Sequence, residues 1–247
     1  MKDENLLFSI IVTTYNNEKT IEKTLTSIID QNIDEERYEI IVVDDCSSDS
    51  TINCIKKIER QNIELIILDK NTGGPSIPRN TGVSHAKGEY IYFLDGDDWL
   101  EKDILLKIER NKNIRKSDVI VGKVIKYKNG NESVHARFMN IREYTNEAPL
   151  KIPYLYYYLG PAGKFIKRTL IKKYKIEFMK NARFGEDKLF FMKVFEKAKK
   201  VSTLSDVSTY LNRSTENESI VKRVNFIEKR KSDIIFFNEV LKIKIKK

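Results

Sequence analysis

The sequence is poor in cysteine, histidine, glycine and proline, and it lacks a long hydrophobic run. Its 247 residues include 2 Cys, 2 His, 10 Gly and 5 Pro, against 12 Tyr and 12 Phe. This scarcity of glycine and proline beside so many aromatic residues excludes a disordered or low-complexity chain. No apolar run approaches the roughly 20 residues of a membrane-spanning helix, so we expect no integral membrane protein.

The two cysteines bear on the cellular setting. Cys46 and Cys54 are spaced neither as a CxxC metal pair nor as a disulfide framework. We therefore expect two free thiols and a cytoplasmic protein. The first apolar run, at 6–12, is too short and too acidic at its start for a signal peptide, so we expect a core strand there.

The net charge of +9 is concentrated near the C-terminal end. Residues 222–247 contain nine basic and three acidic residues, so they carry +6 of this charge. Ile227, Ile234 and Leu241 at sevenfold spacing predict an amphipathic helix over 224–245, and we expect a main domain at 1–220 and a basic tail at 221–247. Such a tail suits an anionic polymer, a membrane surface or nucleic acid, and charge alone does not choose among them.

Strand and helix patterns alternate through the first half of the chain. Four apolar runs rich in Ile, Val and Tyr predict buried strands at 8–15, 38–43, 63–68 and 89–94. Helical patterns follow at 18–30, after Ser48 and Asp49, and from the turn at 71–75 to near residue 88. The alternation predicts an α/β fold with a Rossmann-like, mostly parallel sheet and helices on both faces.

The pattern loosens after residue 117. It predicts a smaller α+β region with strands at 119–127 and 134–138, an aromatic stretch at 154–158 and a helix at 185–197.

Carboxylates follow two of the predicted strands. Asp44 and Asp45 end the second strand, and Asp95 and Asp97 follow the fourth. Ligands of open α/β sheets bind beyond the carboxyl ends of the strands. Asp95 and Asp97 can hold a hard divalent cation that neutralises a diphosphate. A carboxylate at Asp44 or Asp45 can accept the imide N–H of uracil, although a helix-capping role is also open.

Arg79 follows a segment that is first flexible and then stiff, at 73–78. A loop of this kind would present the guanidinium to a phosphate as a bidentate donor, and a surface salt bridge is the other interpretation.

Taken together, the ordered motifs resemble family 2 glycosyltransferases, which have the GT-A fold. They are SIIVTTYN at 9–16, VVDDCSSD at 42–49 and FLDGDD at 93–98. Two further segments, NTGGPSIPRN at 71–80 and GEDKLF at 185–190, are similar to bacterial enzymes that add N-acetylglucosamine to poly(ribitol phosphate) wall teichoic acid. The resemblance covers about residues 6–215.

The resemblance implies an inverting transfer from a UDP-sugar, with Mn²⁺ or Mg²⁺ as cofactor. Asp187 would be the catalytic base, with Glu186 in a supporting role because adjacent helical residues point about 100° apart. The other implied roles are uridine contacts for Thr13 and Tyr15, uracil for Asp45, the nucleotide for Arg79, ribose and metal for Asp95 and Asp97, and an acceptor phosphate for Lys164.

The sequence departs from this family in two ways. Many relatives place a metal-shell His after the strand at 208–213, whereas this chain has none there, and Asn217 or Glu218 would have to substitute. Its two histidines, His85 and His135, are expected at the surface. Relatives also continue into a module that binds polymer or drives trimerisation, whereas this sequence ends at Lys247.

Several alternatives bear on function. A nucleotidyltransferase is disfavoured because 13–18 contains no glycine, and a dinucleotide oxidoreductase because no GxGxxG follows the first strand. A glycosyltransferase of capsular or other surface polysaccharide synthesis with another UDP-hexose stays open, as does a binding module for anionic polymers that uses the basic tail. We expect a polyanionic or polysaccharide acceptor, no nucleic acid, and peripheral membrane association through the tail. The sequence leaves the oligomeric state open.

Overall fold

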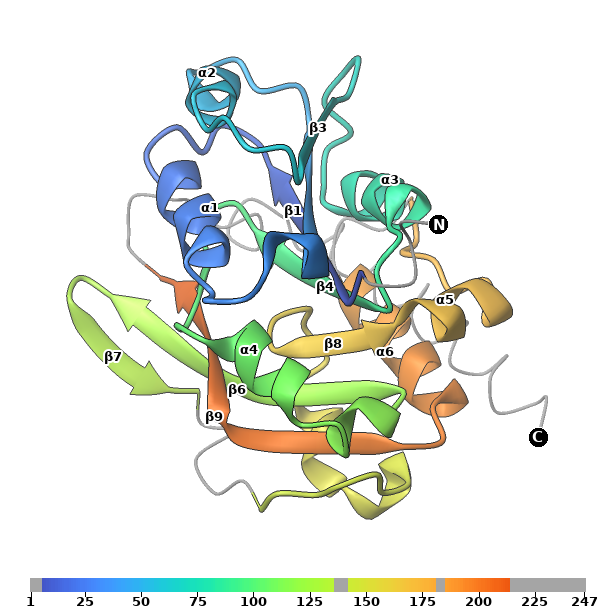
Figure 1. The fold of residues 1–247 in the computed structure, drawn as a ribbon. Coiled ribbons are helices and arrows are strands. Elements are labelled where there is room, and N and C mark those ends of the chain that lie inside the picture. The colour runs from blue at the N-terminus through green and yellow to red at the C-terminus, as the bar shows by residue number, and fades with distance from the viewer. Residues whose placement is uncertain (1–5, 136–141, 181–184, 214–247) are drawn as a thin grey trace.

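The computed structural model describes residues 6–135, 142–180 and 185–213 (Figure 1). The helix predicted at 224–245, the basic tail and the end of the strand predicted at 134–138 lie outside these ranges. Within the described residues, no helix is long and apolar enough to cross a membrane.

Four parallel strands form the first part of the sheet. They are β1 (Phe8–Thr14), β2 (Tyr38–Asp44), β3 (Ile63–Ile67) and β4 (Tyr90–Asp95), in the order β3-β2-β1-β4. Every residue of β1 is buried, as expected of a strand covered on both faces. The four predicted strands are confirmed, each within one residue of its predicted ends.

The remaining strands extend this same sheet rather than forming a separate one. They are β5 (Trp99–Leu100), β6 (Val119–Lys128), β7 (Asn131–Val134), β8 (Lys164–Lys167) and β9 (Val201–Asn212). β8 joins β4 and β6 by antiparallel pairing, whereas β6 and β9 are parallel. The sheet is therefore mixed, and its first four strands are parallel. The smaller α+β region expected after residue 117 thus contributes its strands to the main sheet.

Helices cover both faces of the sheet, as the alternation predicted (Figure 1). They are α1 (Ile21–Ile29), α2 (Thr51–Lys56), α3 (Ser76–His85), α4 (Ile104–Arg110), α5 (Arg168–Tyr174) and α6 (Glu186–Lys197). Short 3₁₀ turns lie at Glu35–Arg37, Ile114–Lys116, Pro149–Lys151 and Pro153–Tyr157.

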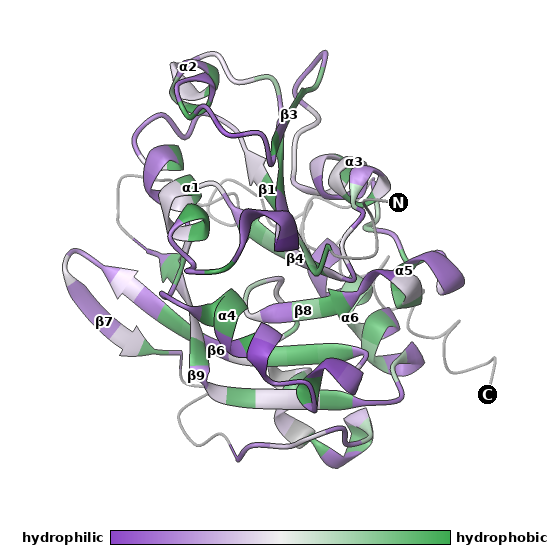
Figure 2. Ribbon diagram, in the orientation of Figure 1, coloured by the Kyte–Doolittle hydropathy of each residue, from purple (hydrophilic) through white to green (hydrophobic). Residues whose placement is uncertain are grey.

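Two hydrophobic clusters pack against the sheet. Ile10 and Val12 of β1 pack with α1, α2 and α4, whereas Ile11 packs with α5 and α6. Neighbouring residues of a strand point to opposite faces, so β1 is buried from both sides. The apolar centres of the strands and the more polar outer helices are visible in Figure 2.

The pairing of β6 with β9 shifts register between Val121 and Lys123, at Gly122. A Cβ atom placed on Gly122 would lie 2.5 Å from the backbone oxygen of Val207. This close approach of two backbones requires glycine.

We expect Gly122→Ala to destabilise the fold by about 1–3 kcal/mol, because β6 and β9 would have to separate to admit the methyl group. Gly74→Ala is the matched control, since a Cβ there meets nothing within 4 Å. Denaturant midpoints of the two variants measure the difference. Equal midpoints for both variants would show that the β6–β9 pairing tolerates a side chain at this position.

Candidate functional site

A chain of polar contacts connects the carboxyl ends of β1 and β4 to the start of α6. Thr13 donates to Oδ1 of Asp95 at 3.1 Å, and Nη2 of Arg79 donates to the same oxygen at 2.8 Å. Nη1 of Arg79 lies 3.6 Å from Oε1 of Glu186. These contacts join residues predicted for the nucleotide site, Thr13, Asp95 and Arg79, to a residue predicted for catalysis. That residue is Glu186.

Arg79 lies at the centre of these contacts. It is 3% exposed, and its guanidinium carbon lies 5.3 Å from the ring centre of Phe178. Burial works to lower the pKa of Arg79, but Asp95, Glu186 and Asp187 outweigh it and raise that pKa. The prediction that a loop over 73–78 presents Arg79 is wrong, because Arg79 lies in the first turn of α3. The loop ends at Pro75, where the helix predicted after the turn at 71–75 begins.

Asp45 is buried beside the end of β2. Its Oδ1 accepts the backbone N–H of Thr72 at 2.9 Å. Burial raises the pKa of Asp45, although the hydrogen bonds from Thr72 oppose this shift. Asp44 is fully buried and bonded by both carboxylate oxygens to Ser47. Asp44 therefore holds the turn after β2, and Asp45 faces the segment that leads to Arg79.

The turn after β4 is fixed by its backbone. Gly96 donates to the carbonyl of Thr13 at 2.8 Å, and its own carbonyl accepts from Thr20 and Thr24. A Cβ atom at Gly96 would lie 2.9 Å from atoms of Thr14 and Asn17. Glycine therefore lets this turn pack against the end of β1.

The carboxylates of this turn have different surroundings. Asp95 and Asp97 are partly exposed, whereas Asp98 is buried and accepts the N–H of Asn212 at 2.8 Å. Burial, and then the charges of Asp97 and Asp95, raise the pKa of Asp98 well above its ordinary value. Asp98 thus binds the end of β9. The sequence did not predict this contact, because Asp98 is only one more acidic residue of the turn.

The helix α6 begins where the sequence predicted. Gly185 has φ of 81°, in the left-handed region that favours glycine, and Glu186 and Asp187 form the first turn. Burial is the main cause that raises the pKa of each carboxyl. Glu186 is in ion contact with Arg79, and its supporting role in catalysis stays a prediction.

The other predicted residues lie in different surroundings. Tyr15 is exposed at the end of β1, where a uridine ring could reach it. Lys164 is 1% exposed and donates to the carbonyls of Gly160 and Ala162 at 2.6 and 3.3 Å. Burial lowers the pKa of Lys164 to about 7. Its ammonium group thus points to buried backbone rather than to the surface.

The side chains of the histidines and cysteines make none of the contacts described above. His85 is exposed and bonded to Glu64 at 2.8 Å, whereas His135 is half-buried. Cys46 and Cys54 are free thiols, as predicted.

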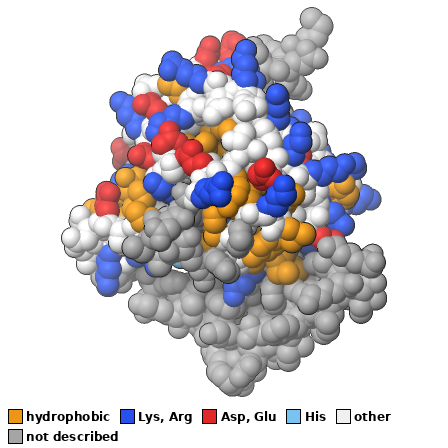
Figure 3. All heavy atoms as spheres, turned by 90° about the horizontal axis from the view of Figure 1, so that it is seen from below, with side chains coloured by type: hydrophobic (Ala, Val, Ile, Leu, Met, Phe, Trp, Pro, Cys, Tyr) orange, Lys and Arg blue, Asp and Glu red, His pale blue; other side chains and the backbone are white. Residues whose placement is uncertain are grey.

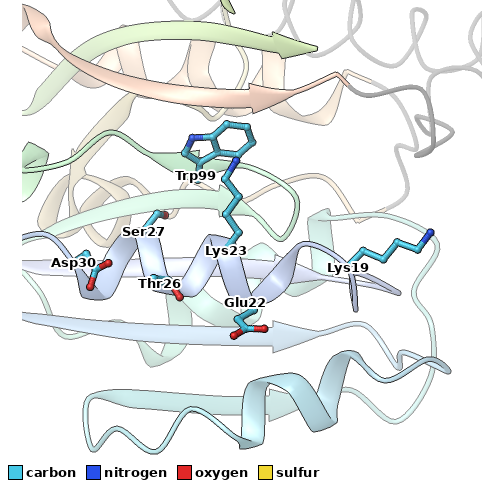
Figure 4. A pocket seen from close by; sticks show the side chains of 7 residues that line it. All are labelled: Lys19, Glu22, Lys23, Thr26, Ser27, Asp30 and Trp99. Carbon is cyan, nitrogen blue, oxygen red and sulfur yellow. The ribbon is translucent and has the colours of Figure 1, made fainter. Parts of the chain in front are cut away.

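A surface hollow lies along α1. Figure 4 shows Lys23 reaching over Trp99, and its Nζ lies 3.1 Å from the ring centre. The lining residues are Lys19, Glu22, Lys23, Thr26, Ser27, Asp30 and Trp99. It holds none of the predicted site residues. Another face, seen from below, mixes apolar side chains with Lys and Arg (Figure 3).

Known proteins resemble this chain in sequence and in structure. Residues 9–175 match the model of the family described as Glycosyl transferase family 2. The chain is 35% identical over 212 residues to the poly(ribitol-phosphate) beta-N-acetylglucosaminyltransferase TarS of Staphylococcus aureus, covering 85% of this chain and 36% of TarS. It is 34% identical over 216 residues to a poly(ribitol-phosphate) beta-glucosyltransferase of Bacillus spizizenii, covering 86% and 33%.

Solved structures agree with the sequence matches. The crystal structure of S. aureus TarS 1–349 in complex with UDP-GlcNAc has a TM-score of 0.80 at 32% identity, covering 89% of this chain and 62% of that chain. The complex of the same fragment with UDP has a TM-score of 0.77 at 33% identity, covering 84% and 60%. The chain spans about a third of the length of the two curated relatives described above.

We expect Arg79→Met to destabilise the fold by about 3 kcal/mol near pH 8, because it leaves Asp95 and Glu186 without their buried cation. The folded-state pKa of Glu186 is already raised, and losing Arg79 raises it further. The destabilisation therefore grows as pH rises through that pKa and is smaller near pH 5. Denaturant midpoints at both pH values test this, with Arg79→Lys as the charge-keeping control. An equal loss of stability at both pH values would show that Arg79 does not stabilise the ionised form of Glu186.

Proposed function

Because the chain belongs to glycosyl transferase family 2, as its motifs predicted, we propose that it moves a sugar, N-acetylglucosamine, from a UDP donor to poly(ribitol phosphate). Members of this family are enzymes that transfer a sugar. The observation that supports the proposal most is the continuous contact from Thr13 through Asp95 and Arg79 to Glu186, beside Asp187. This set of contacts connects the proposed donor-side residues, Thr13 and Asp95, to Glu186, which precedes the proposed base.

The donor side of the proposed site is formed by Asp45 and Tyr15. The buried carboxylate of Asp45 has one oxygen bonded to Thr72, which leaves acceptor capacity for the imide N–H of uracil. The exposed ring of Tyr15 can stack on the base. The relatives solved with UDP and UDP-GlcNAc support this choice of nucleotide.

A divalent cation fits the turn after β4 when the donor diphosphate completes its shell. Asp95 and Asp97 are partly exposed, and Oδ1 of Asp95 is occupied by Thr13 and Arg79. Across the described ranges, no group of three or more His, Cys, Asp or Glu side chains could hold a metal ion. One or two carboxylates with phosphate oxygens are nevertheless a usual Mg²⁺ arrangement. When bound, Mn²⁺ or Mg²⁺ would offset the charge of the departing UDP.

The proposed reaction is a single displacement at the anomeric carbon. Asp187 accepts the proton of an acceptor hydroxyl as that oxygen bonds to the anomeric carbon, and the bond to the UDP oxygen breaks. The configuration of the sugar is inverted, and no covalent sugar–enzyme intermediate forms. Arg79 contacts Asp95 on the donor side and Glu186 next to the proposed base, so it connects the two sides of the proposed site.

The acceptor and the sugar are inferred from the relatives. Two related proteins are named for poly(ribitol phosphate) but for different sugars, N-acetylglucosamine and glucose. Glucose is therefore the second candidate sugar, and another surface polysaccharide is the second candidate acceptor. Release of UDP from a panel of UDP-sugars, with and without poly(ribitol phosphate) and with Mn²⁺ or EDTA, tests these choices. Release that the polymer does not stimulate would reject poly(ribitol phosphate) as the acceptor.

We expect Asp187→Asn to lower the turnover number by about 10²–10⁴-fold, because the acceptor hydroxyl loses its proton acceptor. Polymer-stimulated UDP release measures the loss, and the affinity for UDP should stay unchanged. Glu196→Gln is a matched control, since it neutralises a carboxylate at the other end of α6. Full activity of Asp187→Asn would remove Asp187 as the base.

We expect Asp45→Asn to weaken UDP binding by about tenfold or more, because a carboxylate acceptor for the uracil imide N–H is lost. The asparagine amide can donate to the ring nitrogen of cytosine, so CDP binding should weaken less or improve. Titration calorimetry with UDP and CDP measures both affinities. Equal losses for the two nucleotides would place Asp45 away from the base.

A further inference from the structure

Lys164 carries a buried charge that the reaction described above does not use. Its Nζ lies 4.2 Å from the ring centre of Tyr158 and 4.9 Å from that of Phe191, and its hydrogen bonds go to two carbonyl oxygens. No carboxylate of the described residues forms a direct ion pair with it. A buried cation is costly unless a nearby anion compensates it.

Asp187 is the carboxylate whose charge acts on Lys164. Phe191 follows Asp187 by four residues in α6, so the two side chains lie on one face of the helix. The Lys164 ammonium over the Phe191 ring therefore lies on the side that bears Asp187. Asp187 works to raise the pKa of Lys164, and Lys164 works to lower the pKa of Asp187.

We propose that Lys164 is a positioning residue for sugar transfer, whose buried ammonium adds to the positive charge around the Asp187 carboxylate and helps to keep it in its proton-accepting form. The inference rests on the proposed function, because it takes Asp187 as the base. It also differs from the acceptor-phosphate contact predicted for Lys164, since this ammonium is turned away from the surface.

Other groups also act on Asp187, and Arg79 and then Lys188 lower its pKa more than Lys164 does. Arg79 of α3 is occupied by Asp95 and Glu186, and Lys188 of α6 is exposed, so solvent and salt screen it. Glu186 and Tyr158 supply no positive charge. With a pKa of about 7, Lys164 is charged throughout the acidic range in which a carboxyl group titrates.

The test compares the acid limb of the pH–rate profile in Lys164→Met, Lys164→Arg and Lys188→Met at about 0.5 M salt, where exposed charges are screened. We expect the limb of Lys164→Met to move upward by about one pH unit, with no change in the donor KM. Lys164→Arg should restore the limb, and Lys188→Met should match the unchanged protein. If the acid limb of the pH–rate profile lies at the same pH in Lys164→Met as in the unchanged protein, the inference is overturned.

A measurement without substrate separates this inference from the proposed function. The Asp187 carboxyl is titrated by ¹³C NMR in the unchanged protein and in Lys164→Met, with Asp187→Asn to assign the signal. We expect a higher pKa in Lys164→Met. An inactive Asp187→Asn with an unmoved Asp187 titration would overturn the inference alone, whereas a fully active Asp187→Asn would overturn the base and the inference together.

If Lys164→Met does not fold, titration of the Lys164 ammonium in Asp187→Asn tests the inference instead. In Asp187→Asn the pKa of the Lys164 ammonium should fall, because its counter-charge is removed, and ¹⁵N NMR of lysine measures it. An unchanged Lys164 titration would overturn the pairing.

Discussion

The buried guanidinium of Arg79 is the interaction on which the rest of the site depends. It joins α3 to the end of β4 through Asp95 and to the start of α6 through Glu186. The helix α6 is far from α3 and β4 in the chain, and among the described residues no backbone hydrogen bond connects α6 to β4. A planar cation with several fixed donors suits this task, because it can bind two carboxylates in a defined direction, which a lysine ammonium does less well.

This arrangement links the two halves of the proposed reaction. The donor groups lie at the ends of β1, β2 and β4, where a parallel sheet gathers the polar residues that follow its strands. The proposed base comes from a helix that packs on one face of that sheet, against Phe93 and Phe178. Stacking of Phe178 on Phe190, with ring centres 3.9 Å apart, holds α6 in place beneath Arg79. The aromatic contacts thus hold α6 against the sheet, and the ion contact of Arg79 with Glu186 favours the rotation of α6 about its own axis that turns Glu186 toward Arg79.

Much of this could be predicted from the sequence, for identifiable reasons. β1, β2 and β4 are buried on both faces, so they are rich in apolar residues, and the carboxylates that follow β2 and β4 lie at the same edge of the sheet. Two features had no local signal. The antiparallel entry of β8 between β4 and β6 depends on pairing between distant segments. The burial of Lys164 depends on Tyr158 and Phe191, which the sequence does not place beside it.

The start of α6 holds a balanced group of charges, and this constrains how the site can change. Arg79, Glu186 and Lys164 are each buried, and Asp187 is partly so. Two cations thus stand beside two carboxylates in a place where each charge is poorly solvated. Removing one member alters the protonation of its neighbours rather than only deleting a contact, because the groups interact in a low dielectric. The effects of substitutions here should therefore not add, because both cations favour the ionised form of the proposed base, Asp187.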